Sequence, residues 1–178
     1  MKRSLILLAA VGLCIAFIAM DAAAQPRWMV GGRLGLSMYT VSGAAEWDPN
    51  TFQFKSSTSL KAGLQIGPTA EVIFNKKWAI GTDVNINTQA GTPIEWAFFG
   101  KLYFNVSGSK IRPYGDGGFS LFFAPGGPYF CIRAGGGALF PIAKNLYVAA
   151  DLQLGPVFTS GSTSFYIAAT SGIRYEID

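Results

Sequence analysis

The sequence predicts an all-β fold, an eight-stranded antiparallel transmembrane β-barrel whose strands follow one another as an up-and-down meander. Two observations carry this prediction. Apolar and polar side chains alternate with a period of two residues in eight segments, which is typical of strands with one apolar and one polar face. Hydrophobic residues make up 50% of the chain, yet after Met20 no apolar stretch reaches the ~20 residues of a spanning helix. A membrane protein of this composition has to be a barrel.

The first 24 residues have the pattern of a secretory signal peptide. Lys2 and Arg3 precede an apolar run over residues 5–20, and three alanines follow, the last of them Ala24. We expect cleavage after Ala24. The mature chain, residues 25–178, is then a single outer-membrane β-barrel domain, located in the outer membrane of a Gram-negative-type bacterium.

Composition excludes several classes of function. Removal of the signal leaves 12 basic and 9 acidic residues, and the basic ones are scattered singly, so no nucleic-acid partner is expected. The chain has no histidine, and no Ser-Lys pair or paired carboxylates stand out, so we expect no enzyme and no cofactor. Cys131 is the one cysteine left after cleavage, which excludes an internal disulfide and argues against a metal site.

The clearest strand pattern lies in residues 58–74. One parity holds Leu60, Ala62, Leu64, Ile66, Pro68, Ala70, Val72 and Phe74, and the other holds Lys61, Gly63, Gln65, Gly67, Thr69 and Glu71. The same alternation gives eight predicted strands, each long enough to cross a bilayer as a tilted strand of ~9–11 residues. They are residues 28–42, 58–74, 78–88, 94–106, 112–123, 129–140, 146–158 and 164–177.

Charged and amide side chains test this pattern, because they should share one face of each strand. All sixteen fall on the polar parity: Arg33, Lys61, Gln65, Glu71, Asp83, Asn85, Asn87, Glu95, Lys101, Asn105, Asp116, Arg133, Asp151, Gln153, Arg174 and Glu176. A soluble β-sandwich or lipocalin-like barrel also alternates, but it turns its charges outward and carries many more of them. Only 13% of this chain is charged and the opposite parity holds no charge, which favours a wall that faces lipid.

Aromatic residues gather near the predicted strand ends, as expected for two interfacial girdles. One girdle would contain Trp28, Phe74, Trp78, Phe104, Phe140 and Tyr175, and the other Phe123, Phe130, Phe158 and Phe165. With both termini in the periplasm, the predicted short turns are residues 75–77, 107–111 and 142–145. The outer loops are then residues 43–57, 89–93, 124–128 and 159–163.

The chain resembles the small outer-membrane β-barrel family, the group that includes the OmpA transmembrane domain and OmpX-like proteins. The resemblance rests on Pro113-Tyr114, on Ala134-Gly135-Gly136-Gly137 and on the closing strand. That strand ends Thr170-Ser171-Gly172-Ile173-Arg174-Tyr175-Glu176-Ile177, which is similar to the C-terminal assembly signal of the family, with Thr170, Gly172, Tyr175 and Ile177 at its key positions. Family members often end on an aromatic residue, whereas this chain ends Ile177-Asp178. The resemblance implies that the barrel-assembly machinery is a partner during biogenesis.

The interior of an eight-stranded barrel is a space that side chains just fill. We expect a mutually paired, structural charge network there, made of Arg33, Lys61, Glu71, Asp83, Glu95, Lys101, Asp116, Arg133, Asp151, Arg174 and Glu176. Such a network predicts a non-conducting barrel with a structural or surface-contact role in the cell envelope. The alternatives are a small porin-like or ligand-binding barrel and, third, a membrane-embedded enzyme.

The expected partners are outer-membrane lipid and lipopolysaccharide, with the barrel itself a monomer. The long loop, residues 43–57, adds a candidate surface partner. Trp47-Asp48-Pro49-Asn50 predicts a tight turn, and Phe52 and Phe54 continue the parity of the following strand. The first hairpin is therefore expected to project above the membrane, with edges that a partner strand could pair with, or simply as a tall hairpin without a partner.

Overall fold

The computed structural model describes residues 26–42, 46–48, 53–55, 58–74, 77–88, 92–125, 127–159 and 162–177. The predicted signal peptide lies outside these residues. The strands are β1 (Arg27–Ser42), β2 (Glu46–Asp48), β3 (Gln53–Lys55), β4 (Thr58–Phe74), β5 (Trp78–Asn87), β6 (Ile94–Tyr103), β7 (Arg112–Ala124), β8 (Gly127–Ala143), β9 (Leu146–Thr159) and β10 (Ser162–Ile177). No helix in the described part of the chain is long and apolar enough to cross a membrane.

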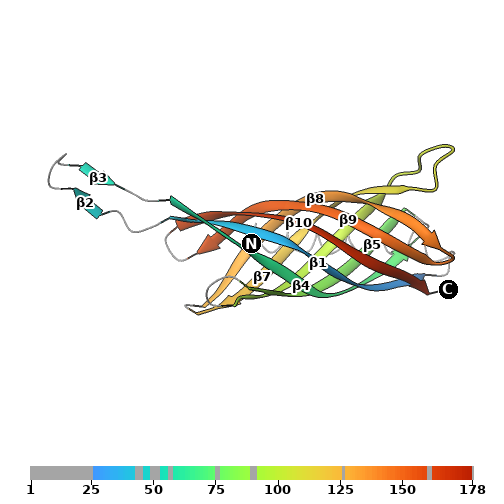
Figure 1. Ribbon diagram of the computed structural model, residues 1–178, viewed down its shortest axis with the longest axis horizontal. Helices are drawn as coiled ribbons and strands as arrows, with labels where there is room; N and C mark the ends of the chain where they lie inside the picture. Colours follow the sequence, from blue (N-terminus) through green and yellow to red (C-terminus); the bar gives the residue numbers. More distant parts are fainter. Residues whose placement is uncertain are drawn as a thin grey trace, which may run out of the picture.

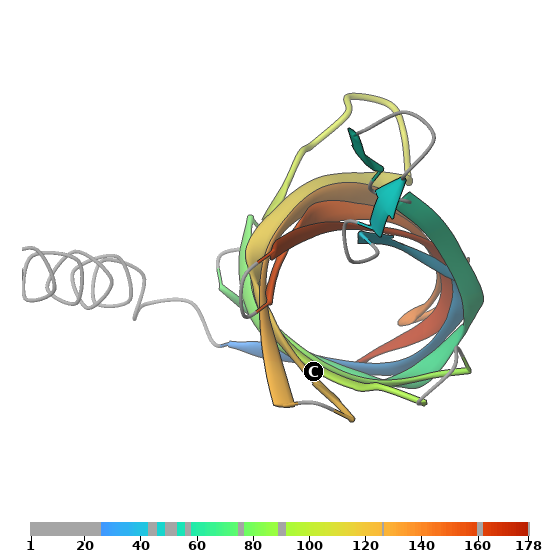
Figure 2. The same ribbon diagram turned by 90° about the vertical axis from the view of Figure 1, so that its left-hand side faces the viewer.

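Eight of these strands form a closed antiparallel barrel in the order β1-β10-β9-β8-β7-β6-β5-β4. Sequence neighbours pair along the chain, and β1 closes the ring by pairing β10 from Trp28–Ile177 to Tyr39–Tyr166. Figure 2 shows the ring along its axis. The predicted eight-stranded meander barrel is confirmed.

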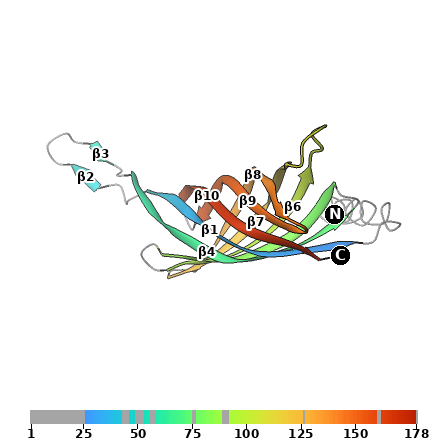
Figure 3. The same cartoon turned by 45° about the vertical axis from the view of Figure 1, so that its right-hand side comes forward.

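The barrel has two different ends (Figure 1). At the turn end lie the connections β4–β5, β6–β7 and β8–β9, together with the start of β1 and the end of β10. At the loop end lie the connections β1–β4, β5–β6, β7–β8 and β9–β10. The β1–β4 connection contains a separate two-stranded sheet, in which Glu46 of β2 pairs with Lys55 of β3. Figures 1 and 3 show this hairpin beyond the loop end of the barrel, as predicted.

Exposure alternates along the strands in step with the sequence pattern. In β6, Ile94 and Trp96 are exposed while Glu95 and Ala97 are fully buried. This follows because successive side chains of a strand point to opposite faces. The outward parity therefore gives an apolar outer wall, and the inward parity fills the barrel with polar side chains.

All eight predicted strands agree with the structure to within three residues at each end, and the fourth is predicted three residues too long. β6 ends at Tyr103, so Phe104 and Asn105 lie beyond it with exposed side chains. The ladder stops here because Phe104 N–H donates to the Pro113 carbonyl at 2.8 Å, but Pro113 has no N–H to return. The turn predicted at residues 142–145 is shorter, since β8 continues to Ala143.

Candidate functional site

A chain of four charged residues crosses the middle of the lumen. Arg33 of β1 forms an ion pair with Asp83 of β5. Arg133 of β8 contacts the same carboxylate at 3.2 Å and reaches Glu95 of β6 at 3.1 Å. All four side chains are almost fully buried. Acid and base alternate, so each buried charge has at least one opposite charge beside it.

Amide and hydroxyl groups add further contacts to these four charged residues. Gln65 and Asn85 donate to Glu95 Oε2 at 2.6 and 3.1 Å, and Arg33 donates to Gln153 Oε1 and Thr170 Oγ1 at 3.0 and 2.9 Å. Together with Arg133, the two amides give both carboxylate oxygens of Glu95 a donor, and Arg33 gains two neutral acceptors beside its ion pair.

A second cluster lies closer to the turn end and joins each carboxylate to a tyrosine. The Lys101 ammonium is 2.7 Å from Glu71 Oε2, and Tyr103 donates to the same carboxylate. Tyr114 donates to Asp151, whose other oxygen is 3.7 Å from Arg174. Lys101 also lies 4.5 Å from the centre of the Tyr114 ring, a cation–π contact.

At the turn end, Glu176 contacts side chains from several other strands. It pairs with Arg27 and lies 3.1 Å from Arg112, and Tyr147 donates to it at 3.1 Å. Arg27 begins β1, Arg112 begins β7, Tyr147 lies in β9 and Glu176 is the penultimate residue of β10. These contacts therefore join four strands at one end of the lumen.

Apolar layers lie on both sides of the charged layer. Toward the loop end pack Phe122, Cys131, Val157, Tyr166 and Ala168, with Tyr39 and Tyr129 against them. Toward the turn end pack Met29, Ile73, Ala79, Tyr103, Tyr114, Leu139 and Ala149. The described lumen thus holds a central charged layer with an apolar layer on either side.

The structure places ten of the eleven predicted network residues in the lumen and excludes one. The assignment of Lys61 to the buried network is wrong, because its side chain is exposed at the loop end. Pairing between β4 and β5 begins only at Gln65–Asn87, so Lys61 lies beyond the closed part of the barrel. There it lines a cavity of about 230 Å³ together with Tyr39, Phe122 and Tyr129.

The sequence prediction missed two arginines that belong to the lumen network, Arg27 and Arg112. Arg27 and Arg112 have the same parity as Arg33 and Asp116 in their strands, so the alternation could have found them. With them the described lumen holds six bases and six acids: Arg27, Arg33, Lys101, Arg112, Arg133 and Arg174, with Glu71, Asp83, Glu95, Asp116, Asp151 and Glu176. Asp116 is half-buried and accepts a hydrogen bond from Gln153 at 3.1 Å.

The inward tyrosines are the other part of the network that the sequence prediction missed. Tyr103, Tyr114, Tyr147 and Tyr166 all lie on the polar parity of their strands and all donate to a carboxylate or amide. Their parity distinguished them from Tyr175, which is on the outer wall and 49% exposed.

The four predicted assembly residues lie on both faces of β10. Thr170 is buried and accepts a hydrogen bond from Arg33, while Gly172 lies close against Gly32 of β1. Tyr175 and Ile177 are exposed on the outer wall at the turn end. Their recognition by assembly machinery stays a prediction.

Among the described residues, no group of three or more Cys, Asp or Glu side chains is placed to hold a metal ion.

The fold and its polar interior define a class: an apolar outer wall around a polar, side-chain-filled lumen is the architecture of a small transmembrane β-barrel. No protein-family model matches the chain, and no curated protein matches its sequence.

Three solved outer-membrane proteins share this fold. The first is Neisserial surface protein A (12% identity, TM-score 0.60, covering 85% of this chain and 99% of that one). The second is the N-terminal β-barrel domain of OprF from Pseudomonas aeruginosa (10%, 0.52, 83% and 99%). The third is the outer membrane protein AlkL (9%, 0.51, 86% and 91%). The resemblance inferred from the sequence is therefore confirmed for the fold.

Proposed function

We propose that this chain is an integral outer-membrane protein, exported by residues 1–24, with its turn end toward the periplasm. The observation that supports the proposal is that apolar side chains cover the outer face of the barrel wall, whereas charged side chains lie on its inner face. The outer wall carries exposed Leu, Ile, Val, Phe and Trp side chains along all eight barrel strands, whereas the acids of those strands are turned into the lumen. Such a surface is stable in lipid and unfavourable in water.

The proposed role is structural or surface-contact, without transport and without catalysis. Two apolar layers and the paired charges between them fill the lumen, so an ion would have to displace buried, paired side chains in order to pass. The buried carboxylates are held by arginine, lysine, tyrosine or amide groups, which suits them to holding strands together.

Planar-bilayer recording of the purified, folded protein tests the sealed lumen. The proposal predicts low, flickering or absent conductance. A large and steady conductance from protein whose insertion has been verified would contradict it and would favour the small porin-like alternative.

A further inference from the structure

The exposed charged side chains on the described part of the barrel are all positive. The six acids of the eight barrel strands are directed into the lumen, where each has a polar partner. Among the residues whose side chains the structure describes, the exposed charged side chains are all lysines: Lys61, Lys77, Lys110 and Lys144.

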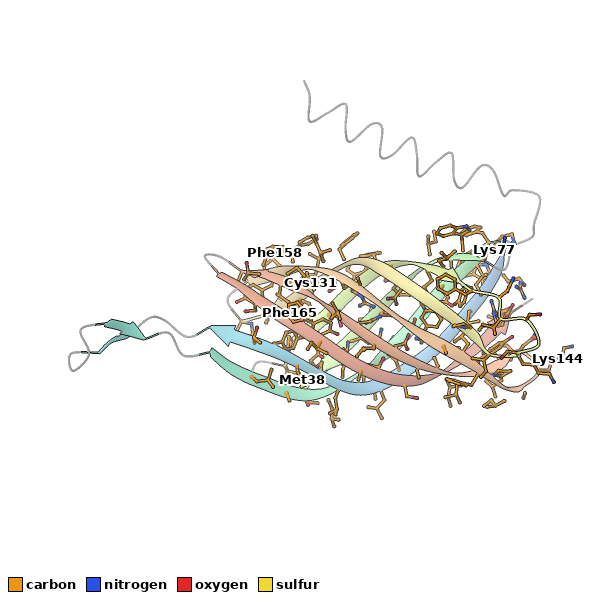
Figure 4. The ribbon with its side chains drawn as sticks, turned by 90° about the horizontal axis from the view of Figure 1, so that it is seen from above. Met38, Lys77, Cys131, Lys144, Phe158 and Phe165 are labelled. Atoms are coloured by element: carbon orange, nitrogen blue, oxygen red, sulfur yellow. The ribbon has the colours of Figure 1, made fainter. Side chains whose placement is uncertain are left out.

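Three of these lysines lie at the turn end, one in each strand connection there. Lys77 follows β4, Lys110 follows β6 and Lys144 follows β8. Figure 4 labels Lys77 and Lys144 at this end, opposite Phe158 and Phe165. Among the described acids at this end, Glu176 is buried and already paired with Arg27 and Arg112. We call Lys77, Lys110 and Lys144 the lysine collar.

The lysine collar lies next to an aromatic girdle, which sets its height in the membrane. Trp28, Trp78, Phe140 and Tyr175 are exposed on the outer wall at the turn end, where aromatic side chains mark the headgroup level. Lysine has a long apolar stem with a charged end, so a lysine just beyond this girdle can extend its ammonium into the phosphate layer.

We infer that the lysine collar binds the phosphate groups of anionic phospholipids in the leaflet that surrounds the turn end. The inference rests on the proposed function, since it requires the barrel to span a membrane. Anionic phospholipid is the partner that fits, because the site offers positive charge without a described acid to neutralise it and lies beside a lipid-facing wall. Each lysine close to an anionic surface should favour the anionic lipid about fivefold.

Tryptophan quenching by brominated lipids can measure this preference, because the chain carries its own reporters. A variant with Trp47→Phe and Trp96→Phe keeps only Trp28 and Trp78, both at the turn end. A second variant with Trp28→Phe, Trp47→Phe and Trp78→Phe keeps only Trp96, which is near the start of β6 and therefore near the loop end. Both are reconstituted in phosphatidylcholine vesicles that contain brominated phosphatidylglycerol or brominated phosphatidylcholine.

The turn-end reporters should show brominated phosphatidylglycerol associating about fivefold or more over brominated phosphatidylcholine at low ionic strength. Replacing the collar by Lys77→Gln, Lys110→Gln and Lys144→Gln should bring this ratio close to one. Because Lys76 adjoins Lys77 in the sequence, a fourfold variant that adds Lys76→Gln completes the series. Lys61→Gln, at the opposite end, is the matched control and should leave the turn-end ratio unchanged.

Two results would overturn the inference. One is an equal ratio for the wild-type chain and the fourfold variant. The other is loss of the preference in inorganic phosphate but not in chloride of the same ionic strength, which would assign the collar to free phosphate instead of lipid. Insertion is checked first by gel mobility with and without boiling. Failure to insert would contradict the proposed function. Insertion without a lipid preference would contradict only the inference that the lysine collar binds anionic phospholipid.

Discussion

Gly172 shows how closely β10 approaches β1. A Cβ at this position would lie 2.1 Å from the Gly32 carbonyl oxygen and 3.0 Å from the Arg33 Cα, both backbone atoms that cannot move aside cheaply. Gly32, on the neighbouring strand, has its nearest potential contact at 3.9 Å. Two glycines in adjacent strands thus differ in whether a methyl group fits.

Gly172→Ala should therefore lower the free energy of unfolding by about 1–3 kcal/mol, the usual cost of overpacking. Gly32→Ala should change it by far less. Urea titration of folded protein in detergent, followed by gel mobility, measures both. Equal effects of the two substitutions would contradict the close approach of β10 to β1.

Arg133 is the residue that bridges two carboxylates, so it tests whether the lumen charges act as pairs. Arg133→Met should destabilise the barrel by about 3–5 kcal/mol, because Glu95 is left without an opposite charge beside it. Adding Glu95→Gln should recover part of this loss, since the amide no longer needs a cation.

The same urea titration of the two single variants and the double variant measures this coupling. If the double variant lost the sum of the two single effects, Arg133 and Glu95 would not be a pair.

At the scale of elements, the two-residue alternation predicts strands well. A shift of a strand by one residue would move all its apolar side chains from the lipid face to the lumen face. Strand ends and partners are harder. Parity assigned Lys61 to the inner face but could not show that β4 extends beyond β5 there. The pairing of Arg33 with Asp83 joins β1 to β5, two strands that are not neighbours in the ring, and depends on the stagger of the barrel, which parity does not reveal.

The β2–β3 hairpin is an element that pairs only with itself. Replacing residues 44–56 by a short Gly-containing turn should leave the barrel folded, with a melting temperature within a few degrees of the original. Heat-dependent gel mobility measures this. A barrel that no longer folds would show that the hairpin is part of the folding unit.

Adhesion assays on the same deletion separate the two interpretations of the hairpin. Loss of adhesion or of complement binding would support a surface contact, whereas no change would support a tall hairpin without a partner.

At the scale of the whole molecule, the protein inverts the usual arrangement of soluble domains. Its twelve lumen-facing charges balance one another, and its surface is hydrocarbon with a few lysines at the ends. This arrangement predicts that tolerance to an outward charge depends on depth in the bilayer.

Leu152 and Ile142 form a matched pair for this test, because both are exposed on the outer wall but Leu152 is near the middle of β9 and Ile142 near the turn end of β8. Leu152→Arg should cost about 2–4 kcal/mol and Ile142→Arg about 0–1 kcal/mol, measured by guanidinium unfolding in lipid vesicles. Similar small costs at both positions would mean that the wall does not face lipid.

The central claim, a barrel folded in the outer membrane, is tested most directly by gel mobility of the outer-membrane fraction with and without boiling. A closed barrel resists detergent until it is heated, so the account predicts that the protein is in this fraction and that its band shifts on boiling. Recovery in the soluble fraction, or a band that does not move, would contradict it.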